Sequence, residues 1–235
     1  QVAAYSVSYA EFPFSPDILD QQRQIARENA DKAAALFQEK TTAADVGVEW
    51  RCEEGRLIPT LGLHARHADL TIVGQDNADD PDVTTMRANE VVLECGRPVL
   101  LTPYIGTSKP IGKRILVAWN GSREATRALN DAIPIMKRAQ LVKVLAVNPD
   151  KNTEGPIPSG DICLHLARHD IAAEAEQVTA KDMNVGDILL SRASDWDVDL
   201  IVMGAYGHSR FREIILGGAT RHLLQHMTVP TFVSH

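Results

Sequence analysis

The sequence predicts an α/β fold in which helices cover both faces of a mainly parallel β-sheet. Three observations predict it. Short apolar runs, typical of strands buried on both faces, alternate along the chain with helical patterns. Part of this pattern occurs twice at a nearly constant spacing, which indicates an internal repeat. A glycine-rich stretch lies between the last long apolar run and the last helical pattern, where ligands bind in folds of this class.

Bulk composition limits the classes of partner. The chain has 235 residues, of which 44% are hydrophobic, and a net charge of −7. Its length suits one large domain or two of ordinary size. The negative charge gives no general attraction to nucleic acid or to an anionic membrane, so an anion site has to be local. No apolar run reaches the roughly 18 residues that cross a bilayer, and no signal peptide is visible.

The cysteines give no evidence of a metal site or a disulfide framework. Cys52, Cys95 and Cys163 are odd in number and widely spaced. This usage is typical of a reducing cytoplasm, which is the location that we expect. We interpret all three as small buried side chains.

The repeat divides the chain into two halves. Residues 68–74 match residues 198–204 at an offset of 130 (204 minus 74), and residues 95–101 match residues 227–233 at an offset of 132 (233 minus 101). The difference falls in the glycine-rich stretch, where insertions are easily tolerated. We therefore predict two tandem doubly wound parallel-sheet domains, 1–104 and 111–235. Prolines and glycines interrupt regular structure in the linker between them.

The second half contains every element of such a domain. Strands are predicted at 115–119, 142–147, 173–178, 200–203 and 231–233, and helical patterns lie between them. Ser122 is the predicted N-cap of the first helix. Strands that alternate with helices pair in parallel, because parallel neighbours need a crossover connection.

The first half matches this pattern from its second strand onward. Strands are predicted at 2–7 and 46–50, and helices at 17–40 and around 58–63. The spacing of the repeat places one strand and one helix before Gln1, so the first domain is expected to lack them in this sequence.

The glycine-rich stretch carries the functional prediction. Gly204, Gly207, Gly217 and Gly218 lie between the apolar run at 200–203 and the last helical pattern. Such a loop exposes backbone N–H groups at the positive end of a helix, which favours phosphate. The sequence therefore predicts nucleotide binding in the C-terminal half.

These features resemble the universal stress protein family, specifically its tandem two-domain bacterial members, over nearly the whole chain. The family motif is glycine, two residues, glycine, nine residues and glycine, which Gly204, Gly207 and Gly217 reproduce. The resemblance implies two adenine nucleotide alpha hydrolase-like domains, with ATP, alone or with Mg²⁺, bound by the C-terminal one. The ATP contacts that it implies are Asn120, Val147, Gly204, Gly207, His208, Ser209, Arg210, Gly217, Gly218 and Thr220.

Two of these positions depart from the family pattern. Gly218 stands where the family has a serine or threonine that donates a hydroxyl to phosphate, and Thr220 is the nearest hydroxyl that could replace it. The loss of one neutral hydrogen bond costs about 0.5–1.5 kcal/mol, which binding can survive. Asn120 stands where the family typically has an aspartate, and its amide can still pair with an adenine or ribose edge.

The first half lacks the motif. No glycine follows Gly74 at the required spacing, and the next residues include Asp76, Asp79, Asp80 and Asp82. Carboxylates repel phosphate, so this half is predicted to bind no ATP. The aspartates lack the glycine and the late glutamate of a calcium loop and are interpreted as a solvated acidic loop.

Other chemistry is not indicated. His208 and Ser209 have no identifiable carboxylate partner, so no catalytic residue is assigned. His222 and His226 share a helical spacing but have no third ligand, so a surface or packing role is favoured over zinc, and no metal residue is assigned.

The resemblance implies an ATP-binding stress-response sensor or adaptor that works through its C-terminal domain. The alternatives are a slow ATPase or phosphotransferase that uses the same pocket, and a structural interaction protein that no longer binds nucleotide. Family members pair through their last strands. Here residues 99–101 and 231–233 are the equivalents, so the two domains are expected to pair within one chain. Further homodimer formation stays open.

Overall fold

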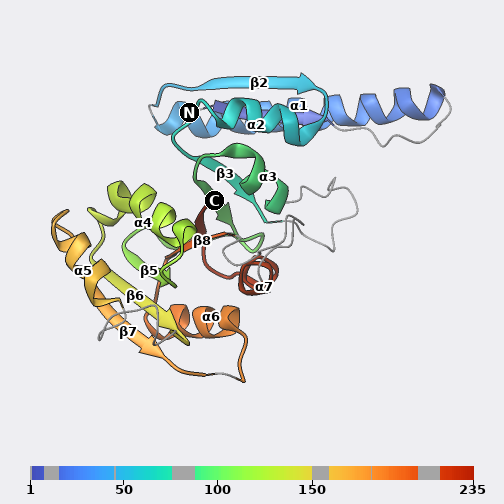
Figure 1. Ribbon diagram of the computed structural model, residues 1–235. Helices are drawn as coiled ribbons and strands as arrows, with labels where there is room; N and C mark the ends of the chain where they lie inside the picture. The colour runs from blue at the N-terminus through green and yellow to red at the C-terminus, as the bar shows by residue number, and fades with distance from the viewer. Residues whose placement is uncertain are drawn as a thin grey trace. The chain divides into compact units, whose positions relative to one another are not determined.

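The computed structural model describes residues 2–7, 16–44, 46–75, 88–149, 159–180, 182–205 and 218–235. The chain forms two compact units, residues 1–64 and residues 65–235 (Figure 1). None of the helices in the described ranges is both long and apolar enough to cross a membrane.

The first unit is built on a two-stranded parallel sheet. Strand β1 (Val2–Val7) pairs along its whole length with β2 (Glu49–Glu54). Helix α1 (Pro16–Ala44) connects them, and α2 (Leu57–Ala65) follows β2. The strand predicted at 46–50 therefore lies further along the chain, because the pairing with β1 begins at Glu49.

The second unit holds a seven-stranded sheet in the order β3-β4-β9-β8-β5-β6-β7. All neighbours pair in parallel except β4 and β9, which are antiparallel. The strands are β3 (Thr71–Gly74), β4 (Val99–Thr102), β5 (Arg114–Trp119), β6 (Leu141–Val147), β7 (Glu174–Val178), β8 (Leu200–Gly204) and β9 (Thr231–Ser234).

The β4–β9 pair joins the two halves of the repeat into one sheet. Leu100 lies opposite Phe232 in this pair, so the predicted pairing of the last strands within one chain is confirmed. Strands β3 and β4 have the same relation to each other as β8 and β9. Beside β3, however, no described strand takes the place that β5 has beside β8.

Helices cover both faces of the C-terminal part of this sheet, as the continuous apolar strands predict. The helices of this unit are α3 (Ala88–Cys95), α4 (Arg123–Met136), α5 (Gly160–Ala167), α6 (Val185–Asp195) and α7 (Gly218–His226). Residues of α4 and α5, including Leu129 and Leu166, pack with alternate strand residues such as Val117 and Val202. The intervening residues, such as Ile201, are also fully buried and point to the opposite face. The doubly wound α/β fold is confirmed.

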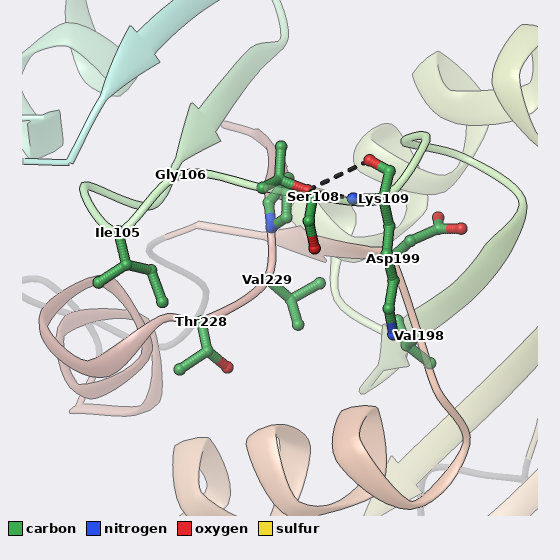
Figure 2. A pocket seen from close by; sticks show the side chains of 10 residues that line it. Ile105, Gly106, Ser108, Lys109, Val198, Asp199, Thr228 and Val229 are labelled. Atoms are coloured by element: carbon green, nitrogen blue, oxygen red, sulfur yellow. Dashed lines mark hydrogen bonds between the residues drawn. The ribbon is translucent and has the colours of Figure 1, made fainter.

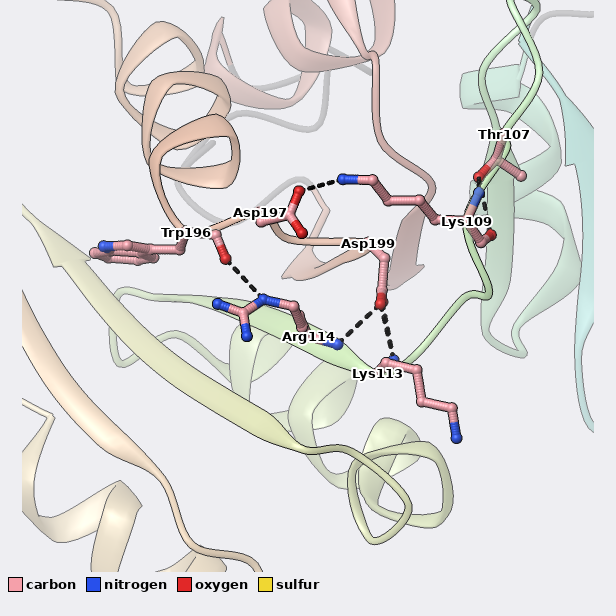
Figure 3. Close-up of polar contacts among 7 residues, drawn as sticks. All are labelled: Thr107, Lys109, Lys113, Arg114, Trp196, Asp197 and Asp199. Carbon is pink, nitrogen blue, oxygen red and sulfur yellow. Dashed lines mark hydrogen bonds and ion pairs between the residues drawn. The ribbon is translucent and has the colours of Figure 1, made fainter.

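A buried carboxylate fixes the start of β5. Asp199 is 6% exposed. Its oxygens accept hydrogen bonds from the backbone N–H groups of Lys113 (3.0 Å) and Arg114 (3.0 Å) (Figure 3), and also from the Gly112 N–H (2.7 Å). A buried charge is stable when amide donors surround it in this way. In the first half the equivalent Asp69 is exposed and pairs with Arg97 at 2.9 Å.

Candidate functional site

The strand order places a candidate site at the carboxyl ends of β5 and β8. Strand β5 pairs with β6 on one side and with β8 on the other, so the direction of winding changes between β5 and β8. In open α/β sheets, ligands bind in the crevice outside such a switch point. Because Ala118 lies opposite Met203, Asn120 and Gly204 follow at the same end of the sheet.

Half of the residues predicted to contact ATP are described. Asn120, Val147 and Gly204 lie at or just beyond the carboxyl ends of three strands, and Gly218 and Thr220 lie in the first turn of α7. The remaining predicted contacts, Gly207, His208, Ser209, Arg210 and Gly217, lie outside the described residues. Helix α7 returns the chain from the end of β8 to the start of β9, so its N-terminus faces this edge of the sheet.

Asn120 turns the chain from β5 into α4. Its Oδ1 accepts a hydrogen bond from the Ser122 N–H at 3.1 Å, and the Ser122 hydroxyl caps α4 by accepting from the Ala125 N–H at 3.1 Å. The predicted N-cap is therefore confirmed. Asn120 is exposed, and within the described ranges its side-chain NH₂ group has no hydrogen-bond partner. That group is available to a ligand.

Gly204 is needed for packing, whatever binds beside it. A Cβ at this position would overlap the backbone of Glu124 and Ala125 and would lie 2.8 Å from the Glu124 Cβ. The first turn of α4 thus packs directly against the end of β8. Gly204 brings the positive end of α4 to the edge of the sheet.

The two candidate hydroxyl positions of α7 have opposite surroundings. Gly218 is exposed, and a Cβ there would meet nothing within 4 Å among the described residues. Thr220 is 5% exposed, so its side chain belongs to the buried face of α7. The exposed position, Gly218, therefore has no hydroxyl group, and the hydroxyl group of Thr220 lies at a buried position.

Two residues of this edge were missed by the sequence analysis. Asn148 follows β6 with a φ of 48° and bonds the Ala180 backbone twice: its Oδ1 accepts from the N–H at 2.8 Å, and its Nδ2 donates to the carbonyl at 3.2 Å. Ser159 precedes α5, is 6% exposed, and its hydroxyl has no partner among the residues that the structure describes. An asparagine before a proline at the end of a strand was a usable signal for Asn148, whereas nothing in the sequence indicates that Ser159 is buried.

One of the two histidines of α7 joins this helix to another. The His222 Nε2 lies 2.6 Å from the Asp187 Oδ1 on α6, whereas the His226 Nδ1 lies 2.9 Å from the His222 carbonyl oxygen within α7 itself. His226 is exposed. In the described ranges, no three His, Cys, Asp or Glu side chains are grouped so that they could hold a metal ion.

A pocket of about 500 Å³ lies at the other end of β8 and β9 (Figure 2). Its volume is within the range of small-molecule sites. Its lining is Ile105, Gly106, Thr107, Ser108, Lys109, Val198, Asp199, Thr228, Val229 and Pro230. The backbone amides described above already neutralise Asp199. Lys109 forms an ion pair with Asp197, which lowers the pKa of that carboxyl group. The two charged groups of its lining, Asp199 and Lys109, are therefore both paired within the protein.

Comparison with known proteins identifies the family. The sequence profile of the universal stress protein family matches residues 112–235. The chain therefore belongs to the universal stress protein family, and the match covers the half that carries the glycine motif. Among curated proteins, no sequence matches this chain.

Solved structures support the fold along the whole chain. A universal stress protein from Archaeoglobus fulgidus DSM 4304 superposes with a TM-score of 0.74 and 17% identity, over 98% of this chain and 85% of that one. A functionally unknown protein from Pseudomonas aeruginosa PAO1 has a TM-score of 0.59 and 14% identity, over 99% and 92%. A putative universal stress protein from Pseudomonas aeruginosa UCBPP-PA14 has a TM-score of 0.55 and 15% identity, over 99% and 91%. At these identities the likeness is one of fold.

Proposed function

We propose that residues 111–235 form a domain that binds ATP at the carboxyl edge of β5 and β8, and that the protein is a cytoplasmic stress-response sensor or adaptor. The single observation that carries the proposal is the switch in strand order between β5 and β8. It brings Asn120 and Gly204 to one edge, toward which the N-terminus of α7 faces. This edge lies within the part of the chain that the family profile matches.

Each element has a role in the proposed complex. The side-chain NH₂ group of Asn120 pairs with the base or the ribose, and the backbone at Val147 borders the base. The amides of the loop from Gly204 to Gly218, together with the positive end of α7, hold the phosphates. His208, Ser209 and Arg210 line the approach to the phosphates, with the Arg210 guanidinium supplying positive charge. The first half, residues 1–104, has no such loop in its sequence and binds no ATP.

The proposed role is binding without rapid turnover. Phosphoryl transfer requires a positioned base or water and, usually, ligands for a metal ion. Besides backbone amides, the residues assigned to the site supply one amide side chain, one guanidinium, the hydroxyls of Ser209 and Thr220 and the imidazole of His208. No carboxylate partner that would make a base of His208 is identifiable in the sequence. Nucleotide occupancy would then change which partner the protein engages.

Thermal denaturation with ATP, AMP and GTP tests the proposal on the wild type and on Gly218→Asp. Gly218 is exposed with open space around it, and a carboxylate at a helix N-terminus stabilises the helix, so this variant should fold normally. The same carboxylate would repel the phosphates. We expect ATP to raise the Tm of the wild type and to leave the Tm of Gly218→Asp nearly unchanged.

Two further variants of the same chain test whether the loss of ATP binding is specific to a carboxylate at position 218. Gly74→Asp places a carboxylate at an exposed glycine of the first half, the repeat equivalent of Gly204, and should keep the full response to ATP. Gly218→Ser restores the family hydroxyl and should strengthen ATP binding by up to about tenfold, the value of one hydrogen bond. A wild type that no nucleotide stabilises would contradict the proposal. Release of phosphate above the rate in buffer would instead support the ATPase alternative.

A further inference from the structure

We infer that the first half of the repeat supports helix α7 of the second half through Gln75, which makes Gln75 a positioning residue for the nucleotide site. The inference about α7 comes from the contacts of Gln75 alone. Its consequence for ATP binding rests on the proposed function.

Gln75 connects three segments of the second unit. It follows β3 directly, and its Nε2 donates to the carbonyl oxygens of Leu224 at 2.8 Å and Gln225 at 3.2 Å. Its Oε1 accepts a hydrogen bond from the Tyr104 N–H at 3.2 Å. One side chain thus joins the end of β3, the turn after β4 and the last turn of α7.

The bonded carbonyls are those that a helix cannot satisfy by itself. The last four carbonyl groups of a helix have no partner within it, and Leu224 and Gln225 belong to the last turn of α7. Donors at this end are also favoured by the helix dipole. Helix α7 has nine residues, whereas isolated helices shorter than about 12–15 residues are marginal in water. Its order therefore depends on contacts of this kind.

The internal repeat provides a comparison within the same molecule. The Gln75 N–H donates to the Thr102 carbonyl at 2.8 Å, and the Ala205 N–H of the second half donates to the Ser234 carbonyl at 2.9 Å. The two backbones are therefore equivalent at this point. Ala205 has no side chain that could cap a helix, so the support runs in one direction. The first half, which lacks the spacing of the glycine motif, thus supports a helix of the second half, which has this spacing.

The other contacts of α7 hold a different part of the helix. His222 bonds Asp187 on α6, and Leu223 is fully buried. These contacts fix the middle of α7 against its own half. Gln75 fixes its C-terminal end, so loss of the Gln75 amide would loosen this end while the helix stays docked.

Order in α7 matters for the proposed site because the phosphates would bind the amides of its first turn. A helix that is already ordered binds without a further loss of conformational entropy. Helix formation is cooperative, so in a helix of nine residues a frayed last turn also weakens the order of the first turn. The first turn then has to be ordered again on binding, which weakens affinity although no contact with the nucleotide is lost. Gln75 therefore acts on binding through the helix.

Hydrogen exchange at the amides of α7 in the full-length protein, with ATP affinity measured by calorimetry, tests the inference. Gln75→Ala removes both donated hydrogen bonds and should speed exchange in the last turn of α7 by about tenfold. Gln75→Glu keeps the shape but cannot donate, and its charge lies at the negative end of the helix, so exchange should be faster still. Gln75→Lys supplies a donor with a favourable charge and should restore much of the protection.

The affinity for ATP should fall in the variants whose α7 amides exchange faster. We expect it to fall by about threefold to tenfold in Gln75→Ala and Gln75→Glu and to recover in Gln75→Lys. The matched control is Gln24→Ala, which removes an exposed hydrogen bond to Glu28 (2.9 Å) within α1 and should alter neither quantity.

Two results would overturn the inference. Wild-type exchange in α7 of both Gln75→Ala and Gln75→Glu would show that Gln75 does not support the helix. Faster exchange with unchanged ATP affinity would show a purely structural role. If the wild type binds no ATP, the proposed function fails, while the exchange measurements still decide whether Gln75 supports α7.

Discussion

At the scale of single residues, the repeat shows that equivalent glycines have different tasks. Gly74 ends β3 and Gly204 ends β8, its equivalent in the repeat, and neither glycine has a positive φ. A Cβ at Gly74 would meet no described atom within 4 Å, whereas a Cβ at Gly204 would overlap the first turn of α4. The difference follows from the sheet order, since no described helix packs on the end of β3 as α4 packs on β8.

The two glycines should therefore respond differently to the same substitution. Gly204→Ala has to displace the backbone of α4 and should lower the free energy of unfolding by about 1–3 kcal/mol. Gly74→Ala has free space and loses unfolded-state entropy, so it should be neutral or stabilise by up to about 1 kcal/mol. Urea denaturation of both variants measures this difference. Equal effects at the two positions would show that α4 does not pack closely on Gly204.

The burial of the three cysteines was only partly predicted from the composition of the chain. All three were interpreted as buried, which is right for Cys95 (0% exposed), partly right for Cys163 and wrong for Cys52, which is exposed. Cys52 lies on β2 of the small first unit. An alternating strand pattern does not tell which face will be covered when the sheet has two strands.

The three thiols should react with a labelling reagent in order of decreasing exposure. Burial raises the pKa of the Cys95 and Cys163 thiols, so at pH 8 a smaller fraction of each is thiolate, the form that reacts. Cys52 should react first, Cys163 next, and Cys95 only on the timescale of unfolding. Because the raised pKa values belong to the folded state, an increase in pH should speed labelling of Cys163. The variant Cys52→Ser should lack the fast phase, and a fast phase that persists would contradict the assignment.

At the scale of elements, the sequence predicted those strands whose bounds depend on the local pattern of apolar residues. The apolar runs at 142–147 and 200–203 became β6 and β8 to within one residue at each end. The strand predicted at 46–50 was shifted, because its pairing partner decided where it begins. The contact of Gln75 with α7 spans 149 residues and depends on the antiparallel β4–β9 pair, so no local pattern could predict it.

Asn148 determines how the carboxyl end of β6 is held against the segment after β7. Asn148→Ala loses both hydrogen bonds to Ala180 and leaves a non-glycine residue at a positive φ, so the free energy of unfolding should fall by about 1–3 kcal/mol. Asn148→Gly removes the same bonds without backbone strain and should cost less. Urea denaturation would check the ranking. A glycine variant less stable than the alanine variant would show that backbone conformation is not the limiting factor.

At the scale of the whole molecule, pairing of β4 with β9 turns two half-sheets into one. An unpaired strand edge promotes association with other chains, and here the last strands of both halves cover each other. The repeat and the family resemblance predicted this pairing. The boundary between the compact units lies between residues 64 and 65, and β3 and β4 are continuous with the C-terminal sheet. The division into domains 1–104 and 111–235 stays a proposal about sequence repeats.

The compact units should also differ in stability, and the tryptophans report on each. Trp50 lies in residues 1–64 and packs against Phe37 with ring centroids 5.5 Å apart, whereas Trp119 and Trp196 lie in residues 65–235. Among the residues of the first unit whose side chains the structure describes, namely 20–21, 23–44 and 46–64, Ala30 is the one hydrophobic residue that is buried. Since buried apolar area is the main stabilising contribution, this unit should unfold at a lower urea concentration.

Tryptophan fluorescence of the wild type during urea denaturation should therefore show two transitions. Trp50→Phe should lose the earlier one and keep the later midpoint. A single transition that is the same in both proteins would mean that the units unfold together.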